Sequence, residues 1–252
     1  MPKNVIFICV FCQIQFLEMF LVMLYSIRKY GKLTNNTDIL VYTTSDFMNI
    51  IKNHKLYYPN IKFVINDTYN TVRDSVLSRL DIFKFRIIDE YSKILYLDTD
   101  IIIKGDLNQV FDLITMDVIY ALEEGTITED SNIYGGKLLF GDDLEKYLGK
   151  PAFSAGIMGY TNSKTIRQLY DNIHTDLTTR FYNLSCIDQA YIVYNSFKYN
   201  LYDNQTFKLL CVNNDNNVRS DKVVHHFPGC VGIYQHKIVK MINFIRELES
   251  IQ

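Results

Sequence analysis

Short apolar runs alternate with helix-like patterns through the first half of the chain. Continuous apolar runs predict strands at residues 4–10, 39–43 and 61–65, and apolar residues spaced three or four apart predict helices at 14–29 and 46–55. This alternation is typical of a mostly parallel sheet with helices on both faces.

The alternation continues up to residue 100. Residues 73–89 place their apolar side chains on one helical stripe, so we expect a single long helix there. The run at 93–97 (KILYL) predicts a buried strand that ends directly before Asp98. Ligands of such sheets bind at the carboxyl ends of the strands, which makes Asp98 and its neighbours candidates for function.

The second half is less regular. It predicts strands at 118–122, 155–160 and 223–227, and helices at 165–178, 186–194 and 237–248. Residues 123–150 have Gly pairs, charges and little periodicity, so we interpret them as a loop or lid. Because no repeat and no linker composition interrupts the pattern, we expect residues 1–252 to form one domain.

Composition narrows the class of protein. Of the 252 residues, 48% are hydrophobic and 21% charged, values that exclude an intrinsically disordered chain. The 26 Lys and Arg nearly balance the 28 Asp and Glu, for a formal net charge of -2. A broad electrostatic grip on nucleic acid or on an anionic membrane is therefore disfavoured, while a local basic pocket for phosphates is still allowed.

The N-terminal apolar stretch is not expected to be a membrane anchor, since Gln13, Gln15 and Glu18 interrupt it. The odd count of five Cys is typical of a reducing compartment, so we expect a soluble cytoplasmic protein. Cys9 and Cys12 have CxxC spacing, but a strand turns residues three apart to opposite faces, which argues against a shared metal or redox site.

Asp98 and Asp100 flank Thr99 directly after the predicted strand at 93–97. Residues two apart at a strand end project to the same side, and paired carboxylates are good ligands for a divalent cation. The alternative is a solvated loop start.

A second polar cluster follows the predicted strand at 223–227, in the sequence VVHHFPG. His225 and His226 point to opposite faces of that strand, so at most one of them reaches a metal. A His beside two Asp favours Mn²⁺ over Mg²⁺, and Gly229 allows backbone N–H groups to approach an anion. The alternative for His226 is a packed, hydrogen-bonded side chain.

Four ordered motifs together carry a family resemblance. They are residues 78–111 (SRLDIFKFRIIDEYSKILYLDTDIIIKGDLNQVF), Phe153-Ser154-Ala155-Gly156, Asp188-Gln189 and His226-Phe227-Pro228-Gly229. The chain resembles the glycogenin-like glycosyltransferases of family 8 over essentially its whole length. The resemblance implies a Rossmann-like nucleotide-diphospho-sugar transferase fold (GT-A type) and retaining transfer of a hexose from a UDP-sugar.

The resemblance also implies roles for particular residues. Asp98, Asp100 and His226 would hold Mn²⁺, with Mg²⁺ as the alternative ion, and the cation would stabilise the departing UDP. The donor would be bound by side chains and backbone from several motifs: Phe16, Arg79, Asp98, Thr99, Ser154, Ala155 and Gly229. The alternative for Arg79 is a salt bridge on a surface helix.

Asp188 and Gln189 match the family's catalytic pair beneath the anomeric carbon. A carboxylate there can stabilise oxocarbenium character or attack as a nucleophile, and the sequence leaves both mechanisms open. The alternative for Asp188 is a helix N-cap, since it precedes an apolar run.

The chain departs from the family pattern in several places. Ser154 stands where the family has Asn, so donor preference is expected to differ. Gly232 replaces a diphosphate-binding Lys, which leaves Lys237 as the nearest downstream candidate. Phe16 keeps the stacking face of the family's Tyr without its hydroxyl. No Tyr matches the self-glucosylated position, which argues against autoglucosylation.

We therefore expect a retaining transferase that uses UDP-glucose or a close relative and an unidentified acceptor. Neither nucleic acid nor a membrane is an expected partner, and a homodimer is compatible with the many Tyr. The frequent Ile, Asn, Lys and Tyr are typical of an AT-rich genome, and the chain is similar to the compact glycogenin-like proteins of large DNA viruses. That similarity would place the protein in the host cytoplasm or the virion.

Two rival functions follow from the same residues. One is a catalytically silent nucleotide-sugar binding or scaffold protein, since Cys12, Ser154 and Gly232 remove donor contacts. The other is a nucleotidyltransferase, but residues 11–18 contain neither the Gly nor the Lys of a triphosphate loop.

Overall fold

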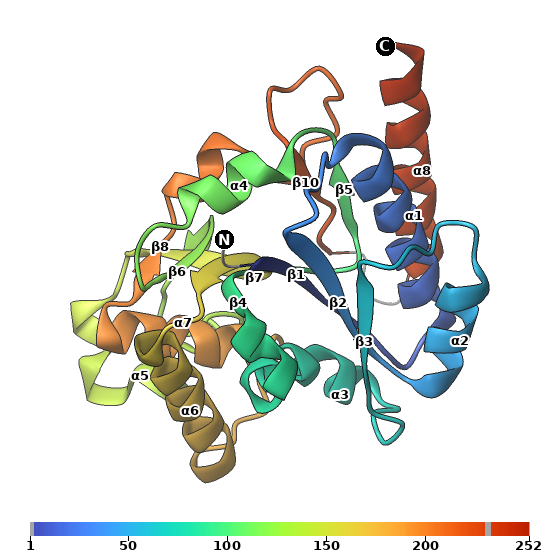
Figure 1. Ribbon diagram of the computed structural model, residues 1–252. Helices are drawn as coiled ribbons and strands as arrows, with labels where there is room; N and C mark the ends of the chain where they lie inside the picture. The colour runs from blue at the N-terminus through green and yellow to red at the C-terminus, as the bar shows by residue number, and fades with distance from the viewer. Residues whose placement is uncertain (1–2, 230–232, 252) are drawn as a thin grey trace.

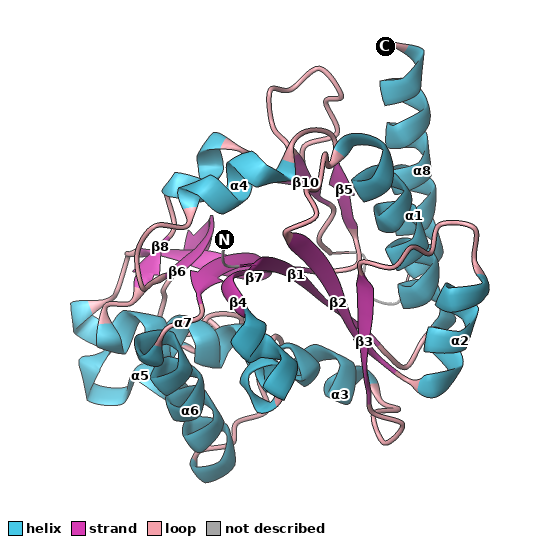
Figure 2. Cartoon of the chain, viewed as in Figure 1, coloured by secondary structure: helices cyan, strands magenta, loops and turns pink. Residues whose placement is uncertain are grey.

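The computed structural model describes residues 3–229 and 233–251, which form an α/β fold around a seven-stranded sheet (Figures 1 and 2). The strand order is β3-β2-β1-β4-β7-β6-β8. Its strands are β1 (Lys3–Val10), β2 (Thr37–Thr43), β3 (Ile61–Ile65), β4 (Tyr91–Leu97), β6 (Ile119–Thr126), β7 (Pro151–Thr161) and β8 (Tyr202–Asp203).

The sheet is mixed and mostly parallel. Strands β3, β2, β1 and β4 pair in parallel, β7 is antiparallel to both β4 and β6, and β8 is parallel to β6. Neighbouring residues of β1 enter opposite cores: Phe7 lies in one and Ile8 in the other. Burial on both faces explains why these strands appear as continuous apolar runs in the sequence.

A second, three-stranded sheet has the order β5-β10-β9, formed by β5 (Ile101–Ile103), β9 (Cys211–Asn213) and β10 (Val224–His226). Three residues separate the end of β4 from the start of β5, and β10 pairs with β5 antiparallel, so that His226 lies opposite Ile101. This pairing brings the end of β10 to the carboxyl end of β4.

Helices cover both faces of the large sheet. They are α1 (Ile14–Tyr30), α2 (Ser45–Asn53), α3 (Val72–Leu77), α4 (Leu107–Leu113), α5 (Gly136–Phe140), α6 (Lys164–Thr179), α7 (Ile187–Tyr199) and α8 (Tyr234–Ser250). Helices α6 and α7 pack in the core that contains Phe7, and α1 packs in the one that contains Ile8. Helix α8 lies along α1 in a third apolar cluster (Figure 1).

Every predicted strand overlaps an observed one, but the long helix predicted at 73–89 is wrong. Helix α3 ends at Leu77, and two 3₁₀ helices follow, Ser78–Lys84 and Arg86–Glu90. All residues from Ser78 to Ile82 are buried, which a helix with one apolar stripe could not achieve. The backbone therefore adopts the narrower 3₁₀ helix, and the polar side chains of Ser78, Arg79 and Asp81 are buried.

The predicted loop or lid at 123–150 is only partly irregular. Strand β6 extends to Thr126, and α5 and a 3₁₀ helix (Gly141–Lys146) occupy much of the rest. Strands β5, β8 and β9 and helix α4 were not predicted, because short elements carry too little periodicity. Within residues 3–229 and 233–251, no helix is long and apolar enough to span a bilayer.

Candidate active site

A cavity of about 470 Å³ opens where β1, β4 and β10 end. Asp98, Thr99 and Asp100 form the turn between β4 and β5 at its floor, and His226 enters from β10. The volume lies within the range of pockets that enclose cofactor-sized molecules. The carboxyl edge predicted to bind a ligand is thus a concave site.

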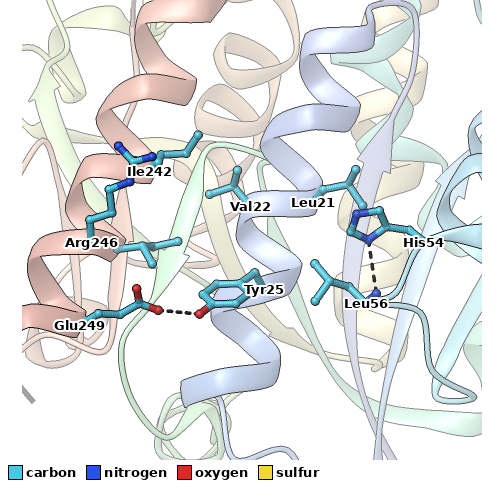
Figure 3. Close-up of a pocket in the computed structure, with 9 residues that line it drawn as sticks. Leu21, Val22, Tyr25, His54, Leu56, Ile242, Arg246 and Glu249 are labelled. Carbon is cyan, nitrogen blue, oxygen red and sulfur yellow. Dashed lines mark hydrogen bonds between the residues drawn. The ribbon is translucent and has the colours of Figure 1, made fainter.

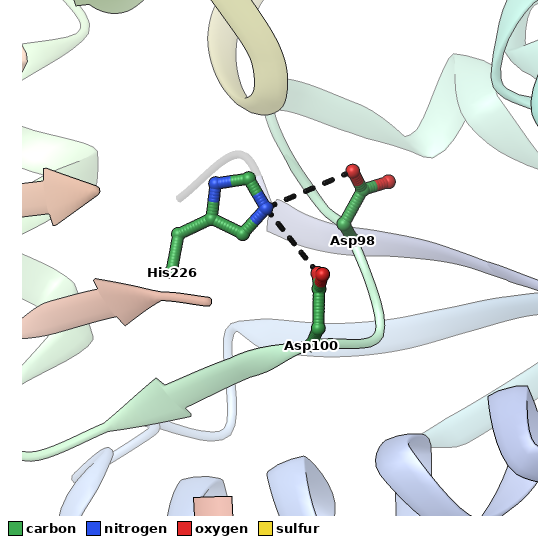
Figure 4. Close-up of side chains that lie close together, drawn as sticks. All are labelled: Asp98, Asp100 and His226. Carbon is green, nitrogen blue, oxygen red and sulfur yellow. Dashed lines mark ion pairs between the residues drawn. The ribbon is translucent and has the colours of Figure 1, made fainter. Parts of the chain in front are cut away.

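Asp98, Asp100 and His226 converge in this cavity (Figure 4). The Nε2 atom of His226 lies 3.3 Å from Asp100 Oδ1 and 4.0 Å from Asp98 Oδ2. One ligand atom from each residue falls within 4.8 Å of the other two. In the described part of the chain, no other group of His, Cys, Asp or Glu has this arrangement, and the Cys9–Cys12 pair does not form one.

The position of the His226 ring suits a cation ligand. Its Nδ1 lies 2.9 Å from Asn213 Oδ1, so a neutral ring that donates its Nδ1 proton to Asn213 would offer the Nε2 lone pair to a cation held by the two carboxylates. Asp100 Oδ1 is buried without a hydrogen-bond partner. Two oxygens and one imidazole nitrogen fit Mn²⁺. His225 points the other way and contacts the Asp215 carbonyl, as the strand geometry predicts.

Gly156 makes room for the His226 ring. A Cβ at this position of β7 would lie 2.2 Å from His226 Cε1 and 3.0 Å from Asp98 Oδ2. The Gly156 carbonyl also accepts a hydrogen bond from the Asp98 N–H, at 2.9 Å. The sequence motif contained this glycine, but only its approach to a residue 70 positions away reveals the role.

Lys237 contacts the same group from α8. Its Nζ donates to Asp100 Oδ2 at 2.6 Å, and both side chains are buried. Burial by itself would raise the pKa of Asp100, but His226 and Lys237 hold it well below its usual range. The pKa of His226 moves the other way: burial lowers it, and the Asp100 carboxylate raises it above the ordinary value.

Arg79 is buried, not on a surface helix as its alternative interpretation held. Its Nη2 lies 3.0 Å from Asp98 Oδ1, its Nε lies 2.8 Å from Asp188 Oδ2, and its Nη1 donates to the Ala155 carbonyl at 2.7 Å. Burial would lower the pKa of this guanidinium, but the two carboxylates hold it well above the ordinary value. Arg79 therefore joins the β4 turn to α7.

Asp188 lies in the first turn of α7, but the N-cap is Cys186, so the N-cap interpretation of Asp188 is wrong. The Nε–H of Arg79 points at the Val76 carbonyl, so Asp188 Oδ2 keeps the ion pair without an aligned hydrogen bond. Burial raises the pKa of Asp188, and Arg79 opposes the shift. A buried acceptor oxygen is left facing Arg79.

The remaining predicted residues border the same cavity or hold its walls. Gln189 Oε1 accepts the Ala155 N–H at 2.9 Å, and the Ser154 hydroxyl accepts the Gly156 N–H at 3.4 Å. Phe16, in the first turn of α1, packs edge-to-face against Tyr234 with ring centroids 5.0 Å apart. Thr99 and Gly229 line the cavity, with Gly229 at φ +83°. Gly232 lies outside the described residues.

A smaller cavity of about 270 Å³ lies between α1 and α8 (Figure 3). Its walls are largely apolar, and the Tyr25 hydroxyl donates to Glu249 Oε1 at 2.5 Å at one end. It holds no cluster of metal-ligating groups. The chemistry of the molecule is therefore concentrated at the β4 turn.

An α/β sheet with a carboxylate–imidazole cluster in a cavity at its carboxyl edge is the architecture of a ligand-binding α/β protein with a candidate metal site. The sequence model of glycosyl transferase family 8 matches residues 7–168, and the chain belongs to this family. Its members are retaining nucleotide-sugar transferases that typically use a divalent metal. No curated protein shows significant sequence similarity to the chain.

Solved structures agree on the fold. The galactosyltransferase LgtC, in complex with donor and acceptor sugar analogs, has a TM-score of 0.62 at 16% identity, with 96% of each chain covered. Mouse xyloside xylosyltransferase 1 has a TM-score of 0.61 at 12% identity, covering 90% of this chain and 98% of its own. Streptococcus pneumoniae glycosyltransferase GlyE has a TM-score of 0.55 at 14% identity, covering 98% of this chain and 63% of its own. The predicted GT-A fold is confirmed.

Proposed function

We propose that this chain, as a single catalytic domain, transfers a hexose from a UDP-sugar to an acceptor with retention of configuration and with Mn²⁺ bound at Asp98, Asp100 and His226. The observation that carries the proposal is the convergence of these three groups beside the buried pair of Arg79 and Asp188 in one cavity. UDP-glucose is the first donor to test.

The cation would supply Lewis-acid stabilisation of the negative charge that grows on the UDP leaving group. Arg79 holds Asp98 in place through Nη2 and keeps the Ala155 carbonyl fixed through Nη1. Its charge also favours an anionic donor in a cavity lined by four carboxylates: Asp98, Asp100, Glu124 and Asp188. Gln189 fixes the Ala155 backbone, which lies next to the Ser154 side chain that faces the donor.

Asp188 is the proposed catalytic carboxylate. Its oxygen without an aligned hydrogen bond can accept a sugar hydroxyl or face the anomeric carbon. The ion pair with Arg79 favours the ionised form and makes the carboxylate a weaker nucleophile. This contact supports electrostatic stabilisation of an oxocarbenium-like state over a covalent intermediate.

The nucleobase is proposed to stack on Phe16. The ring borders the cavity, and Tyr234 fixes its orientation from the side, which leaves a face for a flat heterocycle. Thr99 and Gly229 would contact the donor between the base and the cation.

The first test is a panel of UDP-glucose, UDP-galactose, UDP-xylose and UDP-N-acetylglucosamine incubated with protein and Mn²⁺, with release of UDP as the readout. The galactosyl and xylosyl transferases among the structural neighbours justify including their sugars. Intact-mass spectrometry of the same samples tests self-modification. A protein that binds UDP but releases none from any donor would be the silent binding protein that Ser154 and Cys12 favour.

The matching variant is Asp100→Asn, expected to abolish UDP release, because it removes a charged ligand. Asparagine leaves Lys237 an acceptor, whereas Asp100→Ala would bury an unpaired ammonium and confuse lost activity with lost folding. Asp142→Ala removes an exposed carboxylate and serves as the control. Normal turnover by Asp100→Asn would contradict the proposal.

A homodimer and a cytoplasmic or viral setting stay predictions from the sequence, as does the absence of self-glucosylation. The acceptor is proposed to enter past Glu124 and Tyr134, which line the cavity and belong to the segment 123–150 that the sequence analysis interpreted as a loop or lid.

A further inference from the structure

Lys237 forms a contact that its predicted role at the diphosphate does not require. Its Nζ donates to Asp100 Oδ2, while Asp100 Oδ1 faces His226 Nε2 without a hydrogen-bond partner. One oxygen of the Asp100 carboxylate thus binds the Lys237 ammonium, and the other faces the position where a divalent cation would bind. The Lys237 side chain is only 8% exposed, so little water shields its charge.

Arg79, the other buried Lys or Arg side chain in the described lining of the cavity, is already paired with carboxylates. Arg79 contacts both Asp98 and Asp188, so Asp100 is left with Lys237 and the His226 imidazole as its partners among the described residues that line the cavity. Lys237 also borders the cavity from the first turn of α8, next to Tyr234 and close to the end of the His-Phe-Pro-Gly motif. Its ammonium has two further donors that no described group occupies.

A divalent cation at Asp100 Oδ1 would sit on the same carboxylate as this ammonium. Like charges so close in a partly dry site repel each other, which opposes a cation that arrives alone. A diphosphate brings compensating negative charge and acceptor oxygens for the free donors of Lys237. The same lysine then stabilises the pair of ligands.

We propose that Lys237 couples the binding of the divalent cation to that of the nucleoside diphosphate: it neutralises Asp100 in the empty site, disfavours the cation alone, and favours the cation and diphosphate together. This inference rests on the proposed function and adds a reason for ordered loading. Coupling between two ligands is reciprocal, so UDP tightens cation binding by the factor that the cation tightens UDP binding.

The test measures the affinity of Mn²⁺ from the electron paramagnetic resonance signal of the free ion, with and without saturating UDP. We expect UDP to tighten Mn²⁺ binding in the wild-type protein. The ratio of the Mn²⁺ affinity with UDP to the Mn²⁺ affinity without UDP measures this coupling. In Lys237→Met the ratio should fall roughly tenfold or more, within the usual range of coupling between sites. It should not vanish, since diphosphate oxygens also contact the ion directly. Mn²⁺ alone should bind Lys237→Met at least as tightly as it binds the wild type.

Three further variants make the result specific. Lys240→Met removes an exposed lysine of the same helix and should match the wild type. Lys237→Arg keeps the charge and should retain most of the ratio. Lys237→Gln keeps a donor for Asp100 without the charge, and it should lose the ratio as Lys237→Met does, which covers the case that the methionine variant does not fold.

An unchanged ratio in Lys237→Met or Lys237→Gln would overturn the proposal. The ratio also stays unchanged if the affinity for Mn²⁺ falls equally with and without UDP. That result would mean that Lys237 only orients Asp100. A different result would contradict the proposed function. If the wild-type protein binds Mn²⁺ and UDP but releases no UDP from any donor, the proposed function fails, while the ratio of Mn²⁺ affinities can still be measured.

Discussion

Close contacts between single atoms determine what the candidate site can hold. The His226 ring reaches the two carboxylates only because β7 has Gly156, which lacks a side chain, where the ring passes the strand. Arg79 reaches three partners on different elements because its segment is buried on all sides. Each of these positions tolerates little change, and each change should affect a different property.

Gly156→Ala should weaken Mn²⁺ binding, because its Cβ would lie 2.7 Å from His226 Nε2 and displace the ring. Loss of a well-placed ligand geometry typically costs about 10- to 100-fold in metal affinity. Calorimetric titration with Mn²⁺ checks this, and Gly105→Ala, whose Cβ meets only the Val223 side chain at 3.3 Å, is the control. Equal affinities in the Gly156 variant and the wild type would show that the ring has room to move.

Arg79→Met should lower the free energy of unfolding by about 3 kcal/mol, since it leaves Asp188 buried without a counter-charge. Urea denaturation measures the loss. Adding Asp188→Asn to the same chain should recover part of the stability while activity stays absent. If the double variant is no more stable than Arg79→Met, the pair does not explain the cost.

Secondary-structure elements bring these residues together, and their ends carry the function. The apolar strand at β4 predicted where Asp98 and Asp100 would lie. Alternation along β10 predicted that at most one His would face them, and the family resemblance indicated His226. The helix predicted at 73–89 failed because its spacing does not distinguish one buried stripe from burial all round. The contact of Lys237 with Asp100 was likewise out of reach, since it depends on how α8 packs against α1.

Thr71→Ala should loosen α3, the helix directly before the 3₁₀ helix that presents Arg79. Thr71 and Asp74 form a capping box at the start of α3, with the Asp74 N–H donating to the Thr71 hydroxyl at 3.1 Å. Loss of the cap should cost about 1 kcal/mol of stability and weaken UDP binding severalfold. Thr71→Ser, which keeps the hydroxyl, should behave as the wild type in both urea denaturation and UDP titration. A loss of UDP affinity in Thr71→Ser would point to the methyl group.

At the scale of the whole molecule, a ligand that binds only the folded chain stabilises it. Mn²⁺ at a hundredfold excess over its dissociation constant should add about 2.7 kcal/mol. For a chain of this length that corresponds to a rise in Tm of roughly 5–10 °C. Thermal melts with Mn²⁺, and again after chelation, measure the effect, and Asp100→Asn should show little of it. An equal rise in Asp100→Asn would place the ion elsewhere.

The pairing of β10 with β5 also bears on the order of events during synthesis. Asp100 and Lys237 are 137 positions apart, and His226 joins the site through a strand near the end of the described chain. Contacts between such distant segments form late, because a long loop must close first. A ribosome would therefore have to release the chain through Lys237 before the cluster around Asp100 could form. Nascent chains that stop before β10 would lack one of the three proposed ligands of the cation.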